Sequence, residues 1–469
     1  MMMRYCRRWL LAALTALGGL GGACAQPPAL VSVYDELRVA IETEDTEAVL
    51  ARLAPMIRLE TSVQAGWLQE LSAMFAQRES LAAEMRFDEQ QVVGQRALLV
   101  VTWAFSGKTT ETGEAWSATQ QRLDYLVQKG PHWALLSSDA LAPEVLTRAF
   151  REGRFADPDS GLECSPPAEW RLFALEGARV ALTAWSPTLD AAVAWTLTDL
   201  PGTFTAEQFA RGQQDAEAKL APTLGLEFRD VSMEPDVFGD RPAFRVRRTA
   251  AGPEGLELYA DATYCVVGST LCVCQRVAMP PKAYATHQTA LDQAVASSRL
   301  VEVEATALPA EAGRIDADKY VNEVHGCEIA APPGWTMRVG QGQFDLQVTM
   351  YEPQGDSSIS LGMIRLPDPT VTAEMAVLGD DSLTAEAFDG YELIKQGETQ
   401  VGELPAYESI TTFSFGGETR RRHRVYLVDG DRLFFMFADA APAEKWARLS
   451  PLFEAAIQSF RLIETPPPE

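Results

Sequence analysis

The chain has 469 residues, 47% of them hydrophobic, and carries a formal net charge of −25, with 40 basic against 65 acidic residues. Such a hydrophobic content excludes a wholly disordered chain, and the length corresponds to about three domains. An acidic surface repels phosphate backbones and anionic lipid headgroups, which argues against nucleic-acid binding and leaves cationic or neutral partners.

The first 25 residues have the pattern of an export signal. Three arginines precede an apolar stretch, residues 9–20, that is too short to span a bilayer as a mature helix. Ala23-Cys24-Ala25 is a small-x-small cleavage site, so the mature chain is expected to begin at Gln26, in the periplasm or outside the cell. Alternatively, Cys24 carries a lipid anchor, and Arg7-Arg8 weakly matches a twin-arginine signal. No later segment is predicted to cross a membrane.

Residues 27–150 are predicted to form a first domain. Apolar residues at helical spacing indicate helices at residues 33–41, 46–53 and 63–85. The period then changes to two. Residues 97–101 form a strand that is apolar on both faces, and the last two strands are expected at residues 121–128 and 132–136. Helices followed by antiparallel strands predict an α+β cone, in which helices close a strongly bent sheet.

Three groups of residues in this domain match a known pattern. They are Tyr34, Leu37, Ala40, Thr43 and Asp45 at the start, residues 92–100 before Trp103, and residues 124–127 with Trp133 and Leu135 at the end. With them the domain resembles the nuclear transport factor 2-like (SnoaL-like) superfamily. That resemblance implies a cone with an open mouth, which in some relatives holds an isomerase or dehydratase site.

The mouth of such a cone is the candidate ligand pocket. Its candidate lining residues are Trp67, Trp103, Trp116, Asp124 and Tyr125, although aromatic residues at these spacings more often build a core. Isomerase or dehydratase chemistry needs a carboxylate among apolar walls, so that its pKa rises toward neutrality. Asp124 and Glu70 are the candidates by residue type.

The rest of the chain repeats itself at a spacing of about 165 residues, which predicts two copies of one domain. Residues 161–170 recur at 326–335, 239–244 at 402–407, 264–271 at 426–433, and 299–302 at 461–464. The copies are expected at residues 157–302 and 316–464, as α+β domains with antiparallel sheets. Each has a helix near its middle, at residues 205–220 and 372–387, and a terminal helix, and Thr205 with Gln208 matches a capping box.

The second copy carries motifs of a known group. They are Tyr320-Val321-Asn322 with Gly326, Ile329, Pro332 and Trp335, then Gly402 with Pro405-Ala406-Tyr407, the Val428-Asp429-Gly430 turn with residues 433–435, and Ile457 with residues 459–461. They resemble the PsbP-like/DcrB-like domains. The first copy lacks the Tyr-x-Asn start and is assigned to the group through the repeat.

Arg420, Arg422 and Arg424 share one face of a predicted strand in an otherwise acidic protein. They are the candidate contact for an anion or for an acidic patch of a partner. Two other interpretations remain open. The arginines can be exposed charges that discourage edge pairing, or they can form salt bridges with the protein's own carboxylates.

Five cysteines follow residue 25, and three of them lie close together in one predicted hairpin. Cys265 and Cys272 face each other if Gly268-Ser269 forms the turn, and a disulfide is then possible in an oxidising compartment. Alignment with the other copy instead places Cys265 opposite Thr270. A third interpretation treats Cys272 and Cys274 as apolar core residues, because they align with Phe434 and Met436.

The sequence shows no pattern of a known catalytic or cofactor site. Nucleophile-elbow, P-loop and Rossmann glycine motifs do not occur, and none of the four histidines has metal-ligand spacing, so no metal or cofactor is predicted. We therefore expect an exported, non-catalytic interaction or ligand-binding protein of the cell envelope, with a protein partner or a small apolar ligand. A small-molecule carrier or an isomerase/dehydratase-type enzyme is the alternative, and the oligomeric state stays open.

Overall fold

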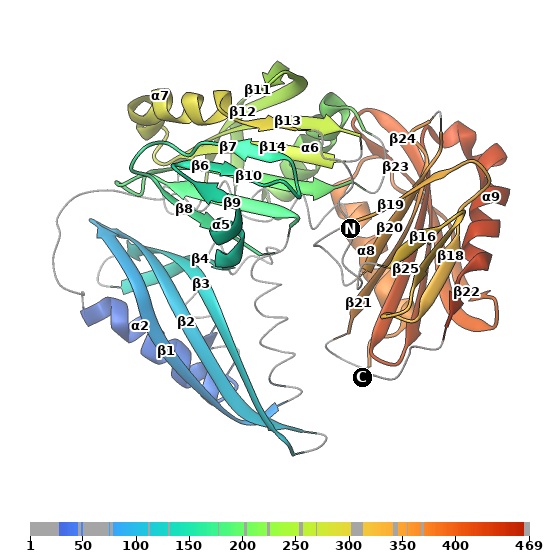
Figure 1. The fold of residues 1–469 in the computed structure, drawn as a ribbon, viewed down its shortest axis with the longest axis horizontal. Coiled ribbons are helices and arrows are strands. Elements are labelled where there is room, and N and C mark those ends of the chain that lie inside the picture. Colours follow the sequence, from blue (N-terminus) through green and yellow to red (C-terminus); the bar gives the residue numbers. More distant parts are fainter. Residues whose placement is uncertain are drawn as a thin grey trace.

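The computed structural model of the protein is a mixed α+β structure built mostly of antiparallel sheets (Figure 1). Its elements fall into three consecutive parts, which we call the first, second and third units. None of the helices it describes is long and apolar enough to cross a membrane. The structure describes residues 28–45, 48–49, 75, 78–110, 113–129, 132–176, 178–200, 204–222, 226–252, 257–268, 270–301, 313–340, 346–353, 355–366 and 370–463.

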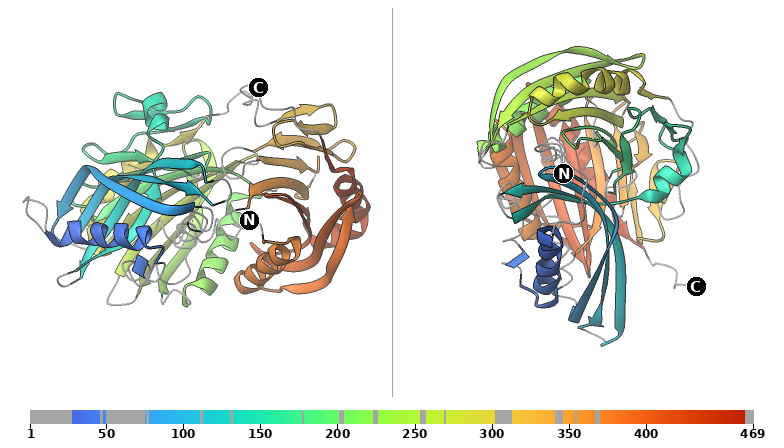
Figure 2. Two further views of the ribbon diagram at one scale, coloured as in Figure 1. Left: turned by 90° about the horizontal axis from the view of Figure 1, so that it is seen from below. Right: turned by 90° about the vertical axis from the view of Figure 1, so that its left-hand side faces the viewer.

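The first unit is a four-stranded antiparallel sheet with a helix on one face. Helix α2 (Pro28–Glu42) precedes strands β1 (Arg78–Val93), β2 (Arg96–Thr109), β3 (Ala115–Lys129) and β4 (His132–Ala140), which pair in that order. Helix α2 contacts β1 and β4, the two outermost strands. One helix can reach both edges only if the sheet curves around it, as Figures 1 and 2 show.

One predicted helix of this unit is wrong in part. Residues 78–85, expected at the end of a helix, form the first half of β1 and pair with β2. Their helix-favouring sequence is overridden because Ala83 and Met85 face the core that α2 covers, where Tyr34 and Trp103 lie. Residue 75 is helical, as predicted, whereas residues 63–74 and 76–77, and most of the helix predicted at 46–53, lie outside the described residues.

The first sheet is apolar on both faces because both faces are covered. Ala97, Leu99 and Val101 of β2 pack toward α2. The alternate residues Leu98 and Val100 pack instead against the large sheet of the second unit. On that outer face the Tyr125 ring stacks on Trp185 with 4.7 Å between ring centroids. Arg96 is fully buried there, and its Nη2 donates to the Met279 carbonyl at 2.6 Å.

The second and third units each combine a small sheet with a seven-stranded sheet. In the second unit the small sheet contains β5 (Phe150–Arg151), β6 (Arg154–Ala156), β7 (Leu162–Cys164) and β15 (Arg299–Leu300). The large sheet contains β8 (Arg171–Ala174), β9 (Val180–Trp185), β10 (Ala191–Asp199), β11 (Glu227–Phe238), β12 (Arg241–Ala251), β13 (Glu257–Val267) and β14 (Thr270–Ala278). Its helices are α5 (Pro143–Ala149), α6 (Ala206–Leu220) and α7 (Lys282–Ala296).

The third unit is arranged in the same way. Its small sheet contains β16 (Arg314–Asp316), β17 (Lys319–Asn322), β18 (Cys327–Ala330) and β26 (Arg461–Leu462). Its large sheet contains β19 (Thr336–Val339), β20 (Leu346–Tyr351), β21 (Ser358–Arg365), β22 (Glu392–Val401), β23 (Leu404–Phe415), β24 (Glu418–Asp429) and β25 (Arg432–Ala440). Its helices are α8 (Ala373–Ala387), the 3₁₀ helix η4 (Ala443–Lys445) and α9 (Trp446–Ser459).

The two units share their strand order. The large sheets run β11-β12-β13-β14-β10-β9-β8 and β22-β23-β24-β25-β21-β20-β19, and the small sheets β15-β7-β6-β5 and β26-β18-β17-β16. Small contacts correspond as well. Ser297 Oγ accepts from the Ser165 amide at 3.0 Å, and Ser459 Oγ accepts from the Ala330 amide at 2.8 Å. In both units a serine at the C-terminal end of the terminal helix therefore fixes the same end of the small sheet.

The second unit begins before residue 157, the predicted start of the first copy, because strands at residues 150–156 pair within its small sheet. Strands β5 and β6 pair with each other and with β7, and Phe155 lies opposite Cys164. In the third unit Tyr320 lies opposite Ile329 in the same way. Phe155-Ala156-Asp157 thus occupies the position of Tyr320-Val321-Asn322, which the sequence comparison did not find in the first copy.

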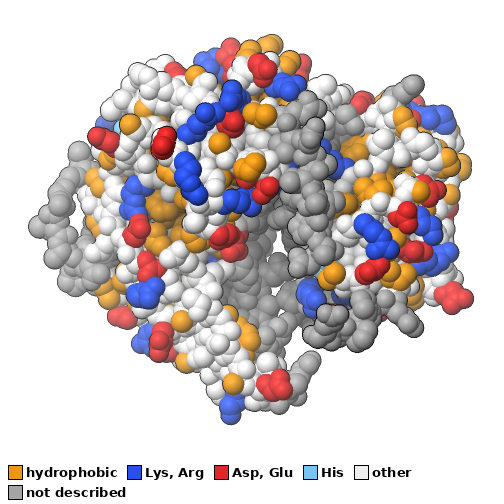
Figure 3. Space-filling model, viewed as in Figure 1, with side chains coloured by type: hydrophobic (Ala, Val, Ile, Leu, Met, Phe, Trp, Pro, Cys, Tyr) orange, Lys and Arg blue, Asp and Glu red, His pale blue; other side chains and the backbone are white. Residues whose placement is uncertain are grey.

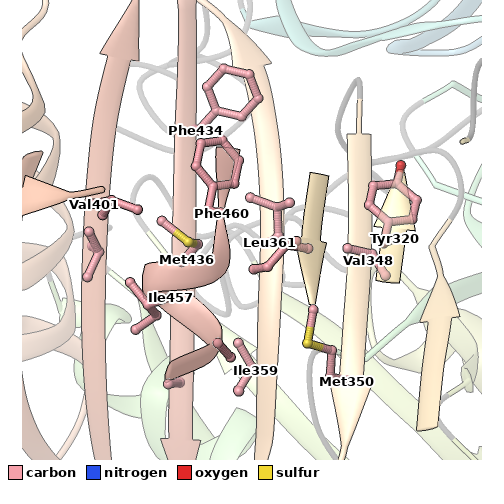
Figure 4. Packing of buried hydrophobic residues seen from close by; sticks show 14 of the residues in the cluster. Tyr320, Val348, Met350, Ile359, Leu361, Val401, Phe434, Met436, Ile457 and Phe460 are labelled. Atoms are coloured by element: carbon pink, nitrogen blue, oxygen red, sulfur yellow. The ribbon is translucent and has the colours of Figure 1, made fainter. Parts of the chain in front are cut away.

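The core of the third unit lies between its large sheet and α9. Figure 4 shows Ile457 and Phe460, at the end of this helix, beside Phe434 and Met436 of β25 and Leu361 of β21. The terminal helix predicted for this copy is present as α9, and its residues Leu449, Phe453, Ala456 and Ile457 are buried. The predicted middle helices are also present, as α6 and α8, and the capping box at Thr205 and Gln208 is formed.

The second and third units meet through α6, which contacts both α8 and β23. The approach is close because two glycines lie at the contact. A Cβ atom on Gly212 of α6 would lie 2.3 Å from the Phe415 ring, and one on Gly416 would lie 2.3 Å from the Gln208 carbonyl oxygen. The ring of Phe415 is itself enclosed by aromatic neighbours, including Phe204, Phe209 and Phe388.

We expect Gly212→Ala to lower the free energy of unfolding by about 1–3 kcal/mol, because the new methyl group overpacks a ring that cannot move aside. Gly379→Ala is the matched control. It also lies within a helix, but its Cβ would meet nothing within 4 Å, so the helix-propensity gain of about 0.5–1 kcal/mol is expected alone. Urea denaturation measures the free energy of unfolding of both variants. Equal stabilisation by the two alanines would contradict a tight contact at Gly212.

Candidate functional site

Three of the five predicted pocket residues lie on the inner face of the first sheet, the face toward α2. Leu99, which packs toward α2, lies opposite Asp124 in the register of β2 and β3. Trp103 and Trp116 follow on the same face, because alternate residues of paired strands point to one side. Tyr125 points to the opposite side. Trp67, and with it Glu70, lies outside the described residues.

Asp124 is the centre of a polar cluster on this inner face. Its side chain is 1% exposed and accepts hydrogen bonds from the Tyr34 hydroxyl at 2.8 Å and from Ser138 Oγ at 2.5 Å. Arg122 Nε donates to Ser138 Oγ at 2.7 Å. Burial raises the pKa of Asp124, although the two hydroxyls and the Arg122 charge oppose this shift. The Trp103 ring lies 6.2 Å from the Tyr34 ring, centroid to centroid.

This cluster can bind a proton or anchor a polar group of a ligand, since a carboxylate with a raised pKa lies among aromatic rings. Both Asp124 oxygens already have a donor, which equally suits a structural role. Sequence reasoning named Asp124 but not Ser138 or Arg122. A signal for Arg122 exists, because it lies two residues before Asp124 in the same strand and therefore on the same face.

A second group joins hydroxyl, imidazole and carboxylate side chains near the contact of the first and second units. Asp190 Oδ1 lies 2.8 Å from His287 Nε2, and Thr188 Oγ1 lies 3.3 Å from the same nitrogen. A catalytic triad needs the carboxylate and the hydroxyl on different ring nitrogens. Because both contact Nε2, this group does not have triad geometry.

The predicted partner contact at Arg420, Arg422 and Arg424 is corrected by the structure, which buries all three side chains at 1%, 5% and 0% exposure. They lie on the face of β24 that α8 and the second unit cover. Their charges are neutralised inside the protein, which is the salt-bridge interpretation that the sequence left open. A strand sequence shows which residues share a face but not what covers that face.

Each arginine has its own partners. Arg422 binds Asp439 through two hydrogen bonds, Nε to Oδ1 at 2.6 Å and Nη2 to Oδ2 at 2.7 Å. Arg424 contacts Asp381 at 2.6 Å and Asp380 at 2.9 Å. The guanidinium of Arg420 lies 4.2 Å above the ring of Phe204, a residue of the second unit, so this arginine contributes to the junction between the units.

The opposite face of the same strands carries a polar pair that differs between the units. In the third unit Glu408 lies 2.6 Å from His423 Nε2 and also pairs with Lys395. At the equivalent positions of the second unit Arg245 Nε donates to Asp261 at 2.8 Å. The acidic and basic members have therefore changed places between the strands.

The five cysteines of the described residues are buried and have free thiols. The register places Cys265 directly opposite Cys272, with Gly268 in the turn. Leu427 and Phe434 form the equivalent pair in the third unit, so both hairpins have the same register and Thr270 is not the partner of Cys265. The disulfide itself stays a prediction. No group of His, Cys, Asp and Glu among the described residues could hold a metal ion.

We expect Arg422→Ala to lower the free energy of unfolding by about 3–5 kcal/mol, because it leaves the buried Asp439 without a counter-charge. Arg365→Ala is the matched control. Arg365, an exposed residue at the end of β21, pairs with the exposed Asp431 at 3.2 Å, and the loss there is expected to be about 0–1 kcal/mol. Urea denaturation measures both losses, and similar values for the two variants would show that Asp439 is solvated.

Acid is expected to weaken the third unit through Glu408. Hydrogen bonding to His423 and Lys395, against the effect of burial, lowers the pKa of Glu408 to about 2 from an ordinary value of 4.5. A carboxyl with a depressed folded-state pKa stabilises the fold above its ordinary pKa, and that contribution is lost as the pH falls from 4.5 to about 2. After discounting for solvent screening, we expect a contribution of about 1 kcal/mol.

Glu408→Gln should therefore lose less stability than the wild type between pH 5 and pH 2, measured by urea midpoints at each pH. Glu398→Gln, a change of an exposed carboxyl on the neighbouring strand β22, is the control and should follow the wild type. A Glu408→Gln curve parallel to the wild type would contradict the role of this pair.

The chain matches no model of a known protein family and no curated protein. It is similar to the solution structure of cyanobacterial PsbP (CyanoP) from Synechocystis, at 17% identity and a TM-score of 0.26, over 31% of this chain and 91% of that chain. It is also similar to immunity protein TplEi of T6SS from Pseudomonas aeruginosa, at 13% identity and a TM-score of 0.23, over 68% of this chain and 99% of that chain. A third similar structure is the Tle4-Tli4 complex, at 13% identity and a TM-score of 0.23, over 67% of this chain and 99% of that chain. Similarity at this level carries no argument about function.

Proposed function

We propose that the chain is an exported, non-catalytic binding protein of the cell envelope, in which a cone domain of the nuclear transport factor 2 type precedes two PsbP-like domains. The shared strand order of the second and third units supports two copies of one domain. The curved sheet around α2 supports the cone. The export signal rests on residues 1–25, which lie outside the described residues.

The observation that carries this proposal is where the polar clusters lie. Arg96 links the first unit to a carbonyl of the second, and Arg420 contacts the second unit from the third. Arg422 and Arg424 are neutralised by internal carboxylates. Charged groups that could carry chemistry are thus used for contacts between the units, by Arg96 and Arg420, or are neutralised within the third unit, as Arg422 and Arg424 are. A rigid scaffold of this kind supports binding through its surface better than turnover at an open site.

The chemistry of the partner follows from the charge. Residues 1–25 contain three arginines and no acidic residue, so their removal makes the net charge more negative than −25. Figure 3 shows acidic and basic side chains interspersed on one face, without a large basic patch. Such a surface favours a partner that presents cationic or neutral groups.

The proposal predicts a specific partner in the cell envelope. The tagged full-length chain should be crosslinked in its own cells and the captured proteins identified by mass spectrometry, with one partner recovered in stoichiometric amount. A matched strain that expresses the chain without residues 2–25 is the control, because that chain stays in the cytoplasm and should lose the partner. Absence of any envelope protein above this control would end the interaction proposal.

A second candidate function, binding of a small apolar ligand in the first unit, is favoured by Asp124 and Trp103 on the inner face. The neutral fluorescent probe N-phenylnaphthylamine should bind the mature chain and raise its unfolding temperature, and Trp103→Leu should weaken both effects. Val39→Thr, at an exposed position of α2, is the control. The whole chain is needed, because an isolated first unit would expose Leu98, Val100 and Tyr125. Equal binding by the two variants would remove this candidate.

A further inference from the structure

Four buried cysteines share one core cluster of the second unit, namely Cys164, Cys265, Cys272 and Cys274. The third unit has apolar residues at the four equivalent positions, namely Ile329, Leu427, Phe434 and Met436, all buried in its own core. The fold therefore requires only an apolar side chain at each position. Packing alone does not explain why all four are cysteine in one unit.

The strand register brings two of these thiols together. Cys265 on β13 lies directly opposite Cys272 on β14, two residue pairs from the hairpin turn. Directly opposite residues of an antiparallel pair have Cα atoms about 4.5–5.5 Å apart, which lies within the span of a disulfide. Cys272 and Cys274 are successive same-face residues of one strand, about 6.8 Å apart, at the outer limit of that span. The register thus selects Cys265 and Cys272.

We propose that Cys265 and Cys272 form a cross-strand disulfide in the mature chain. The two thiols give up two protons and two electrons to a protein disulfide oxidant of the export compartment. One thiolate attacks the oxidant's disulfide, and the other displaces the reduced oxidant from the mixed disulfide. The occurrence of this reaction in cells rests on the export assumed in the proposed function, whereas the pairing of the two residues does not.

The bond has to form before the core closes. Both cysteines are fully buried in the folded chain, out of reach of a protein oxidant. Burial also raises the pKa of the Cys265 thiol to about 11, which leaves little of the reactive thiolate. Oxidation therefore belongs to the folding of the exported chain, and the folded dithiol should resist later oxidation.

The bond would stabilise the contact with the third unit as well as the hairpin that contains it. Side chains on the other face of β13 and β14, Tyr264, Leu271 and Val273, belong to the apolar cluster that joins the second unit to Phe413 and Phe415 of the third. A disulfide on one face fixes the register of both strands and thereby the positions of these residues. Reduction is then expected to weaken the junction between the units as well as the second unit.

Peptide mapping tests the bond directly. The mature chain is isolated from the cell envelope, alkylated with iodoacetamide in denaturant without reductant, and digested with trypsin. No Lys or Arg lies between Arg248 and Arg276, so Cys265, Cys272 and Cys274 occur in one peptide. That peptide should lack two hydrogen atoms and carry its one alkyl group on Cys274, and its two halves should stay linked after cleavage at Leu271, which together place the bond between Cys265 and Cys272. Alkylation of all five cysteines, or a different linked pair, overturns the proposal.

Two further measurements separate this proposal from the export proposal. Mature chain unfolded and refolded in a glutathione redox buffer should form the same bond, even if the chain in cells proves to be cytoplasmic. The urea midpoint of the oxidised protein should fall on reduction. Cys265→Ala and Cys272→Ala should abolish that response equally, whereas Cys327→Ala, in the third unit, should retain it. A reductant response that survives Cys265→Ala contradicts the assignment.

Discussion

A β-sheet with apolar residues on both faces must be covered on both, and this constraint organises the whole chain. The first sheet has α2 on one face and the second unit on the other. One face of the large sheet of the second unit is covered by two different neighbours. The first unit covers Leu258 and Ala260, and α6 covers Ala262 and Tyr264. Each unit thus completes its burial with surface from its neighbour, as expected when apolar burial is the main stabilising term.

The same fold meets different neighbours by changing the residues on one face. The cross-strand pair Ala260 and Val277 of the second unit packs against the first unit. The equivalent pair in the third unit is Arg422 and Asp439, which form a buried ion pair beside the rings of Phe413 and Phe437. A buried pair of this kind loses much of its attraction to desolvation, so its contribution lies more in specifying geometry than in stability.

Much of the architecture could be predicted from the sequence, because it depends on local patterns. The repeat, the middle and terminal helices and the capping box at Thr205 follow from spacing and composition. The candidate sites depend on what lies across from a residue. The arginine face was identified as a face, but its burial depends on Asp439 and on α8, which the strand itself does not reveal. The residue opposite Cys265, Cys272 or Thr270, depended on a register shift of two residues. Phe155 was missed because it replaces Tyr320 of the third unit.

Two copies of one fold in a single chain carry a risk during folding, since a strand of one copy can pair with the sister strand of the other. The exchanged charges on β12–β13 and β23–β24 act against this error. If β23 paired with β13, Glu408 would lie beside Asp261, and if β12 paired with β24, Arg245 would lie beside His423 instead of a carboxylate. Glu408 and Asp261 would be like charges side by side, which destabilise a sheet, and Arg245 would lose its carboxylate partner. The inversion therefore lets each copy recognise its own strands, and an intramolecular swap would be penalised at both places at once.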